Sequence, residues 1–201
     1  ADGLAKIIHN SGAARNDIVT ITGSSFLVPC IFVSIDVVER VTGSSGYDNI
    51  GVGIVKDNNN FLFASVDAVT GNYRVQCKIG GSNSWLLIVS GLSWTAPYKL
   101  GLSLVGNCAC LWRDVGSGWV AVGADNSVSV ESKYDFRTTG NLSGWKAGFT
   151  SASQNNCEWH FDNLVWGSFG RVGMRDMTMV TNVDGSLYTV GDNAYFTATC
   201  A

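Results

Sequence analysis

The chain has 201 residues, which is enough for one large all-β domain with a small appendage. Apolar residues make up 46% of it and charged residues only 14%, so a disordered chain is excluded. The formal net charge is −3 without any Lys/Arg cluster, so neither nucleic acid nor an anionic membrane is an expected partner, and no apolar run reaches the ~18 residues of a membrane helix.

Short runs in which apolar and polar residues alternate recur along the chain, and this period of two is typical of strands with one buried face. The clearest run is 73–79, where Tyr73, Val75 and Cys77 alternate with charged and polar residues. No stretch has a sustained period of 3.6, so almost no helix is expected. Strands are predicted near 26–41, 49–56, 61–67, 73–79, 84–90, 98–105, 108–114, 118–122, 144–151 and 157–166, with further strands at 177–181 and 194–200.

This succession of strands and polar turns predicts an all-β fold, a two-sheet antiparallel jelly-roll sandwich over residues 1–167. The boundary is placed at Gly167-Ser168-Phe169-Gly170, directly after Trp166. Residues 168–201 are expected to form a C-terminal β-hairpin extension, which either packs on the sandwich or begins a second domain. We favour packing on the sandwich, because a lone hairpin is only marginally stable in water.

The chain has six cysteines without a C-x-x-C pair, and only two histidines. A zinc site needs paired Cys or spaced His ligands, so the sequence instead predicts disulfides and a secreted, extracellular protein. If the extension packs on the sandwich, Cys200 is expected to bond near Cys157 or Cys30, and the other pairings stay open. The alternative is a set of buried thiols that act as small apolar side chains. The six are Cys30, Cys77, Cys108, Cys110, Cys157 and Cys200.

Four segments carry a resemblance to a known superfamily. They read NIGVGIVKDNNNFLFASVD, YRVQCKIGG, YKLGLSLVGNCACLWRDVGSGWVAVG and WKAGFTSASQNNCEWHFDNLVWG, and the last contains Phe161-Asp162-Asn163. Over residues 26–166 their order resembles the concanavalin A-like lectin/glucanase superfamily, including laminin G-like modules, in which an F-D-N run marks the terminal strand. The resemblance implies a jelly-roll sandwich and a carbohydrate partner.

The tail carries a second resemblance. Its sequence GMRDMTMVTNVDGSLYTVGDNAYFTATCA is similar to the first blade of a five-bladed β-propeller glycosidase of the arabinanase/xylosidase kind. In that family the early Asp is a catalytic carboxylate, which the resemblance transfers to Asp176. Met177 stands where the family has Pro, and the other blades are absent from the 201 residues, so the tail alone is not such an enzyme.

Aromatic side chains are the candidate ligand-binding residues, because sugars bind through their C–H surfaces to exposed rings flanked by hydrogen-bonding groups. The chain has seven Trp, and the alternative for each of them is core packing. The candidates are Trp85, Trp94, Tyr98 and Trp145. Together with the resemblance they predict a secreted, lectin-like carbohydrate-binding module, an accessory part of a polysaccharide-acting glycoside hydrolase.

Two other functions stay open. Glu158, His160 and Asp162 share one face of a predicted strand, so they are the candidate acid/base group of a small glycan hydrolase or lyase. The alternative for these three is a solvated face opposite Trp159 and Phe161. A structural or adhesive particle subunit is the other function, in which residues 170–201 add strands to a neighbouring copy.

Calcium is the one metal that the sequence suggests. Asp162 and Asn163 offer the hard oxygen ligands that this ion prefers, and a structural site is predicted there. No D-x-D-x-D run supports it, and the alternative is that both side chains cap a turn.

Overall fold

The computed structural model describes residues 4–9, 15–42, 46–123, 127–138, 140–154, 156–168, 174–184, 186, 188–191, 193–194 and 196–200. The chain divides into two compact units, Ala1–Ser168 and Phe169–Ala201. The described residues form strands, turns and loops without any helix, as the sequence predicts. None of them therefore belongs to a helix that is long and apolar enough to cross a membrane.

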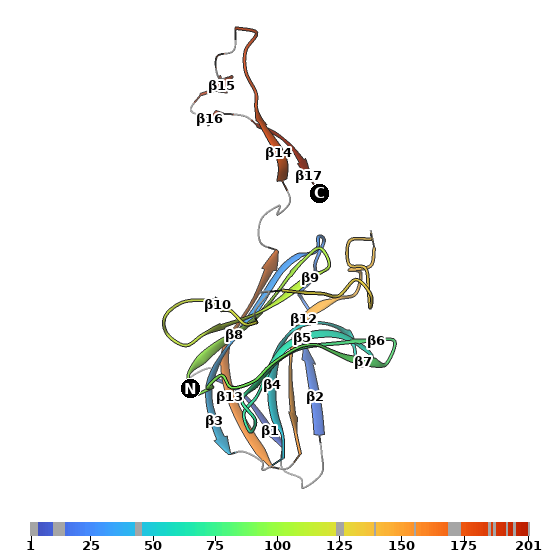
Figure 1. The fold of residues 1–201 in the computed structure, drawn as a ribbon, viewed down its shortest axis with the longest axis vertical. Helices are drawn as coiled ribbons and strands as arrows, with labels where there is room; N and C mark the ends of the chain where they lie inside the picture. The colour runs from blue at the N-terminus through green and yellow to red at the C-terminus, as the bar shows by residue number, and fades with distance from the viewer. Residues whose placement is uncertain are drawn as a thin grey trace. The chain divides into compact units, whose positions relative to one another are not determined.

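The first unit consists of two antiparallel sheets (Figure 1). One sheet has seven strands: β1 (Ala5–His9), β3 (Cys30–Thr42), β8 (Tyr98–Val105), β9 (Cys108–Asp114), β10 (Val120–Ala121), β11 (Val128–Ser129) and β13 (Cys157–Ser168). Their order is β1-β13-β3-β8-β9-β10, and β11 also pairs with β9.

The other sheet has six strands: β2 (Arg15–Thr20), β4 (Asp48–Asp57), β5 (Asn60–Asp67), β6 (Asn72–Ile79), β7 (Ser82–Val89) and β12 (Lys146–Ser153). Their order is β2-β12-β4-β5-β6-β7. The sequence prediction contains no strand before residue 26, so β1 and β2 are additions. Each pairs with a strand from the far end of the unit, β1 with β13 and β2 with β12, and each forms the edge of its sheet.

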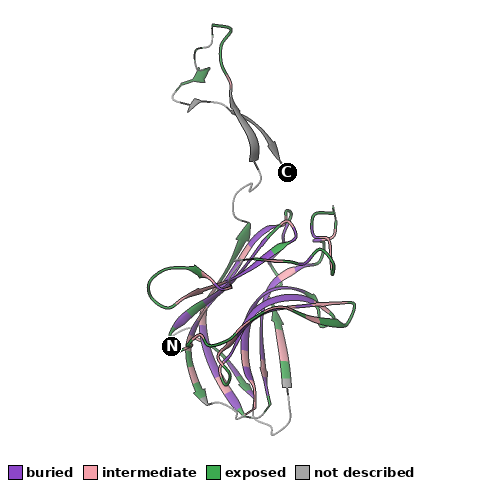
Figure 2. Cartoon of the chain, in the orientation of Figure 1, coloured by how far each residue is buried: buried purple, intermediate pink, exposed green. Residues whose placement is uncertain are grey.

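The hydrophobic core lies between the two sheets, where Figure 2 shows the buried segments of the strands. Val33, Ile35 and Val37 alternate along β3 and are fully buried, and Tyr73 and Val75 do the same on β6. The residues that alternate with them on the same strands therefore face away from the core, toward the outer face of each sheet. On β6 these include the polar residues of the run 73–79.

The second unit consists of two short antiparallel pairs. Strand β14 (Met174–Met179) pairs with β17 (Phe196–Cys200), and β15 (Thr189–Val190) pairs with β16 (Asn193–Ala194). A turn precedes β15, in which the Ser186 backbone N–H donates to Asp184 Oδ1 at 2.9 Å. Whether this unit packs on the sandwich or begins a further domain stays a prediction.

The disulfide prediction is wrong for four of the six cysteines. Cys77, Cys108, Cys110 and Cys157 are free thiols. All but Cys108 are buried, so they act as small apolar side chains. Burial raises the pKa of Cys77 and of Cys110 to about 11, and burial with the nearby Asp48 carboxylate raises that of Cys157 to about 12. The side chain of Cys200 lies outside the described residues.

Candidate functional site

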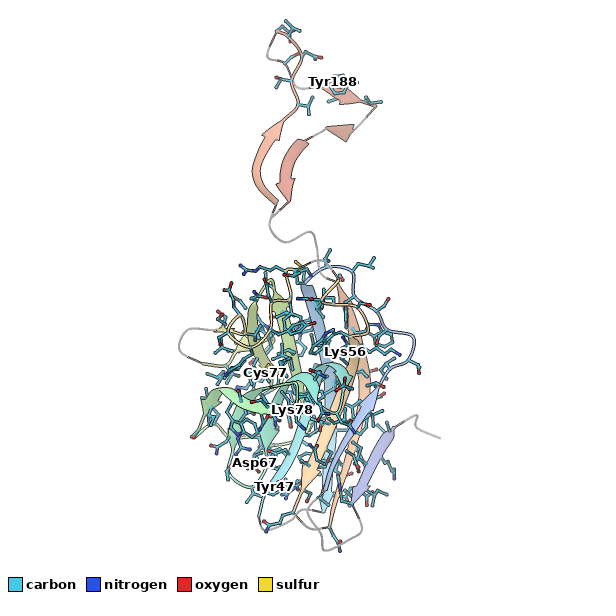
Figure 3. The ribbon with its side chains drawn as sticks, turned by 90° about the vertical axis from the view of Figure 1, so that its right-hand side faces the viewer. Tyr47, Lys56, Asp67, Cys77, Lys78 and Tyr188 are labelled. Atoms are coloured by element: carbon cyan, nitrogen blue, oxygen red, sulfur yellow. The ribbon has the colours of Figure 1, made fainter. Side chains whose placement is uncertain are left out.

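A hollow of about 440 Å³ lies on the outer face of the six-stranded sheet, and we call it the Trp85 hollow. Every strand of that sheet contributes to it, and Tyr47 comes from the loop before β4. In Figure 3, Tyr47 and Asp67 lie toward one end of the sandwich, away from Lys56 and Lys78. The lining residues are Asn16, Tyr47, Asn49, Ser65, Arg74, Gln76, Trp85, Ile88, Thr150 and Ala152.

The strand register aligns the floor of the hollow. Thr150 on β12 pairs with Gly51 on β4, Gly51 with Ser65 on β5, Ser65 with Arg74 on β6, and Arg74 with Ile88 on β7. At ~4.8 Å between strands, this row of residues extends over roughly 20 Å. A Cβ atom on Gly51 would lie 3.0 Å from both Ser65 Cβ and Thr150 Cγ2, so a glycine at this position lets the side chains of Ser65 and Thr150 lie close together on this face.

Arg74 is the best-fixed polar side chain of the hollow. Its Nη1 donates to Asn49 Oδ1 at 3.0 Å, and its Nη2 donates to Asp67 Oδ2 at 3.1 Å. The guanidinium carbon lies 5.2 Å from the centre of the Trp85 ring, within the range of a cation–π contact. Three partners therefore hold one guanidinium in place beside an aromatic ring.

Asp67 is the buried counterion of Arg74, with only 1% of its side chain exposed. Burial alone raises the pKa of this carboxyl, but hydrogen bonds oppose it. The Thr70 hydroxyl and the backbone N–H groups of Asp48 and Val69 all donate to Asp67. Together with the charge of Arg74 they lower the pKa of Asp67 below its ordinary value, so the carboxyl is ionised at neutral pH.

Hydrogen bonds also fix the polar groups at the two sides of the hollow. On the β2 side, the Thr150 hydroxyl is 2.9 Å from Asn16 Oδ1 and 3.0 Å from the Asp17 carbonyl. On the β7 side, Gln76 Nε2 donates to Asn83 Oδ1 at 2.8 Å. The hollow thus combines an exposed indole with amide and hydroxyl groups whose positions are set before a ligand arrives.

No protein-family model matches the sequence, and no curated protein matches it. Solved structures do match the fold. The carbohydrate binding module CBM66 of Bacillus subtilis is 14% identical with a TM-score of 0.51, and the match covers 83% of this chain and 96% of that one. A family 7 alginate lyase in complex with its product is 12% identical with a TM-score of 0.53, over 84% and 81%.

A third match is the GH43 protein BlXynB of Bacillus licheniformis. It is 13% identical with a TM-score of 0.55, and the match covers 83% of this chain but only 33% of that one. These likenesses establish the fold. At such low identity they do not transfer an activity, so the residues of the Trp85 hollow have to be judged by their own chemistry.

The four aromatic residues predicted to bind a ligand differ in how far they are exposed. Trp85 is 46% exposed and lines the hollow. Tyr98 and Trp145 are only 3% and 1% exposed, so the prediction that they offer a ring to a ligand is corrected: both belong to the core. Trp145 packs there against Tyr134 and Phe136. The sequence alone does not distinguish such a buried tryptophan from an exposed one.

Trp94 lies at another hollow, of about 590 Å³, which it lines together with Glu39 and Arg40. Its ring is already occupied, because it packs on Trp159 at 5.4 Å and Arg40 lies 5.7 Å from its centre. Its indole N–H donates to the Ala68 carbonyl at 2.7 Å. Trp94 therefore has less free surface for a ligand than Trp85.

A third hollow, of about 610 Å³, opens between β7 and the strands β10 and β11. Its lining is mostly aliphatic, with Leu87, Val89 and Val122 among the residues, and it includes no aromatic side chain among the described residues. The described part of its lining therefore has neither the ring nor the amide groups that a sugar site combines.

The predicted acid/base group is only partly assembled. His160 Nε2 lies 2.6 Å from Glu158 Oε1, and His160 Nδ1 lies 3.3 Å from Glu39 Oε2, a residue that the sequence analysis did not include. Asp162 is not joined to His160 by any hydrogen bond or ion pair in the described part of the chain. Shifts of register in the pairing of β13 with β3, on either side of Phe161, interrupt the alternation that the prediction assumed. All these residues lie on the seven-stranded sheet, away from the strands that carry the Trp85 hollow.

The predicted calcium ligands are engaged with protein groups. The Asn163 side chain donates to Asp36 Oδ2 at 3.0 Å, and the Asn163 backbone N–H donates to Asp162 Oδ1 at 2.7 Å. No group of three or more His, Cys, Asp or Glu side chains suited to a metal ion occurs among the described residues. The calcium site stays a prediction, and so does the role of Asp176, whose side chain is not described.

Sequence reasoning identified Trp85 but missed the polar lining of the hollow. Asn16 and Thr150 lie 134 residues apart in sequence and meet only because β2 pairs with β12. The one usable signal was on β6, where the alternation of 73–79 already turns Arg74 and Gln76 outward.

Proposed function

We propose that this chain binds carbohydrate at the Trp85 hollow, as a secreted accessory module of a polysaccharide-acting enzyme. The observation that carries the proposal is the combination found there. A tryptophan that is 46% exposed stands beside a fixed guanidinium and several amide and hydroxyl groups, on one open sheet face. Sugar sites need this combination of ring surface and convergent hydrogen-bonding groups.

The proposed binding uses each group for one task. The exposed part of the Trp85 ring covers the C–H surface of a sugar, and the side chains of Asn49, Gln76 and Asn16 exchange hydrogen bonds with its hydroxyl groups. Because Arg74 already holds Asn49, Asn83 holds Gln76 and Thr150 holds Asn16, little conformational freedom is lost when a ligand binds. The row of roughly 20 Å across the strands is long enough for several sugar units of a chain.

The structural likenesses support the module part of the proposal. A carbohydrate binding module shares the fold over nearly its whole length, at 96% of that chain. In BlXynB the same fold accounts for 33% of a longer chain, as expected of one module among others.

Polysaccharide affinity electrophoresis with wild type and Trp85→Ala tests the proposal. Wild type should be retarded by at least one plant, microbial or animal polysaccharide, and Trp85→Ala should weaken binding by about 2 kcal/mol, roughly thirtyfold. Trp166→Ala is the matched control, because Trp166 is similarly exposed at 40% but lies on the seven-stranded sheet. Equal losses in both variants, or no retardation of wild type by any polysaccharide, would contradict the proposal.

A further inference from the structure

The lining of the Trp85 hollow carries almost no charge. Among the described residues that form it, Arg74 is the one with a formal charge. The others are amides, hydroxyls, two aliphatic side chains and two aromatic rings. The electrostatic character of the hollow therefore depends on what surrounds Arg74.

The charge of Arg74 is already compensated. Asp67 Oδ2 lies 3.1 Å from Arg74 Nη2, and Asp67 is 1% exposed, so solvent ions do not reach the pair from the Asp67 side. A ligand carboxylate next to Arg74 would meet the field of an ion pair instead of a free cation. The whole chain adds no attraction for a polyanion, because its formal net charge is −3.

The hydrogen-bonding groups that remain for a ligand are of both kinds. Asn49 uses Oδ1 as the acceptor for Arg74, which leaves its Nδ2 as a donor, whereas Gln76 uses Nε2 toward Asn83, which leaves its Oε1 as an acceptor. A sugar hydroxyl both donates and accepts, so it can satisfy the two. A carboxylate only accepts, so it can pair with the Asn49 donor but not with the Gln76 oxygen.

We infer that the ligand of the Trp85 hollow is a neutral, hydroxyl-rich polysaccharide and not a polymer of uronic acids. This inference rests on the proposed function and narrows its substrate class. The compensated Arg74–Asp67 pair acts as a fixed dipole. It can interact with sugar hydroxyl groups, but it does not raise the affinity for an anion.

The first test compares binding of wild type to neutral polysaccharides, such as xylan, arabinan, mannan, β-glucan and fructan, and to alginate and polygalacturonate. We expect Trp85-dependent binding to a neutral polymer whose Kd changes less than about twofold from low to high salt. Uronate polymers should bind at least roughly tenfold more weakly. Trp85-dependent binding that favours a uronate polymer and weakens with salt would overturn the inference alone. No binding to any polymer would overturn the proposed function and the inference with it.

The second test adds an uncompensated positive charge to the hollow. Gln76→Lys should gain salt-sensitive binding to alginate or polygalacturonate of roughly tenfold. Ser168→Lys, an exposed position at the end of β13, changes the net charge equally and should gain none. If Gln76→Lys does not fold, Ile88→Lys repeats the test at another lining position, which is 54% exposed and therefore expected to tolerate a lysine. If the hollow variants gain no more than Ser168→Lys does, charge does not set the selectivity and the inference is wrong.

Discussion

Replacing Asp67 by Asn is expected to destabilise the sandwich and to loosen Arg74 at the same time. The asparagine Oδ1 can still accept from the backbone N–H groups of Asp48 and Val69, which both donate to Asp67 Oδ1 in the native protein. The new amide nitrogen takes the place of Oδ2, and there it faces the Nη2 donor of Arg74. Two donors then meet where an ion pair stood.

The magnitude follows from burial. Breaking a buried ion pair by removing one charge costs about 3–5 kcal/mol. Here Arg74 keeps 16% exposure and can be partly rehydrated, so the lower end of that range applies, and we expect a loss of about 3 kcal/mol in the free energy of unfolding.

Urea denaturation at neutral pH measures this loss, and its pH dependence identifies the cause. Because the folded-state pKa of Asp67 lies below the ordinary value of 3.8, its stabilisation is present above that value and is lost as the pH falls through the folded pKa. The difference between wild type and Asp67→Asn should therefore be constant near neutrality and shrink in acid. Asp57→Asn, at an exposed turn carboxylate, is the matched control and should cost less than about 1 kcal/mol. A loss below about 1 kcal/mol for Asp67→Asn, or a difference that persists in acid, would show that the ion pair with Arg74 is not the source of the stability.

Three further outcomes are expected. Trp145→Ala should cost about 3–5 kcal/mol of stability, because a fully buried indole is lost, whereas Trp85→Ala should cost less than about 1 kcal/mol; comparable losses in thermal unfolding would contradict the placement of the two rings. In the native protein an alkylating reagent should modify Cys108, which is exposed, but not Cys77, Cys110 or Cys157, as mass spectrometry of the labelled peptides can check. Glu158→Gln together with Asp162→Asn should leave polysaccharide binding unchanged, since both residues lie on the other sheet; a loss of binding in affinity electrophoresis would relocate the site.

The strands of the middle of the chain could be predicted because their alternation is strong and local. In 73–79, for example, Tyr73 and Val75 turn inward and Arg74 outward, and the structure confirms this. Strands β1 and β2 were not predicted. The sequence of β2, RNDIVT, has only two adjacent apolar residues, and it forms a strand because β12 supplies the hydrogen-bonding partners from more than 120 residues away.

The candidate site, like the strands, could be predicted only in part. Trp85 was identified because tryptophans are the usual stacking residues of sugar sites, but Tyr98 and Trp145 had the same signal and are core residues. Exposure depends on which elements cover a side chain, and a single sequence does not contain that information. The polar lining follows from the register across six strands, which pattern and spacing along the chain do not determine.

Mapping a bound oligosaccharide by NMR shows directly whether the Trp85 hollow binds sugar. An oligosaccharide of a polymer that retards the protein is titrated into isotope-labelled chain, and the amide signals that shift are assigned. We expect the shifts to cluster on neighbouring strands of the six-stranded sheet, at Gly51, Ser65, Arg74 and Thr150 and at the indole N–H of Trp85. Shifts that cluster on β3, β8 and β9, or around Trp94 alone, would contradict it.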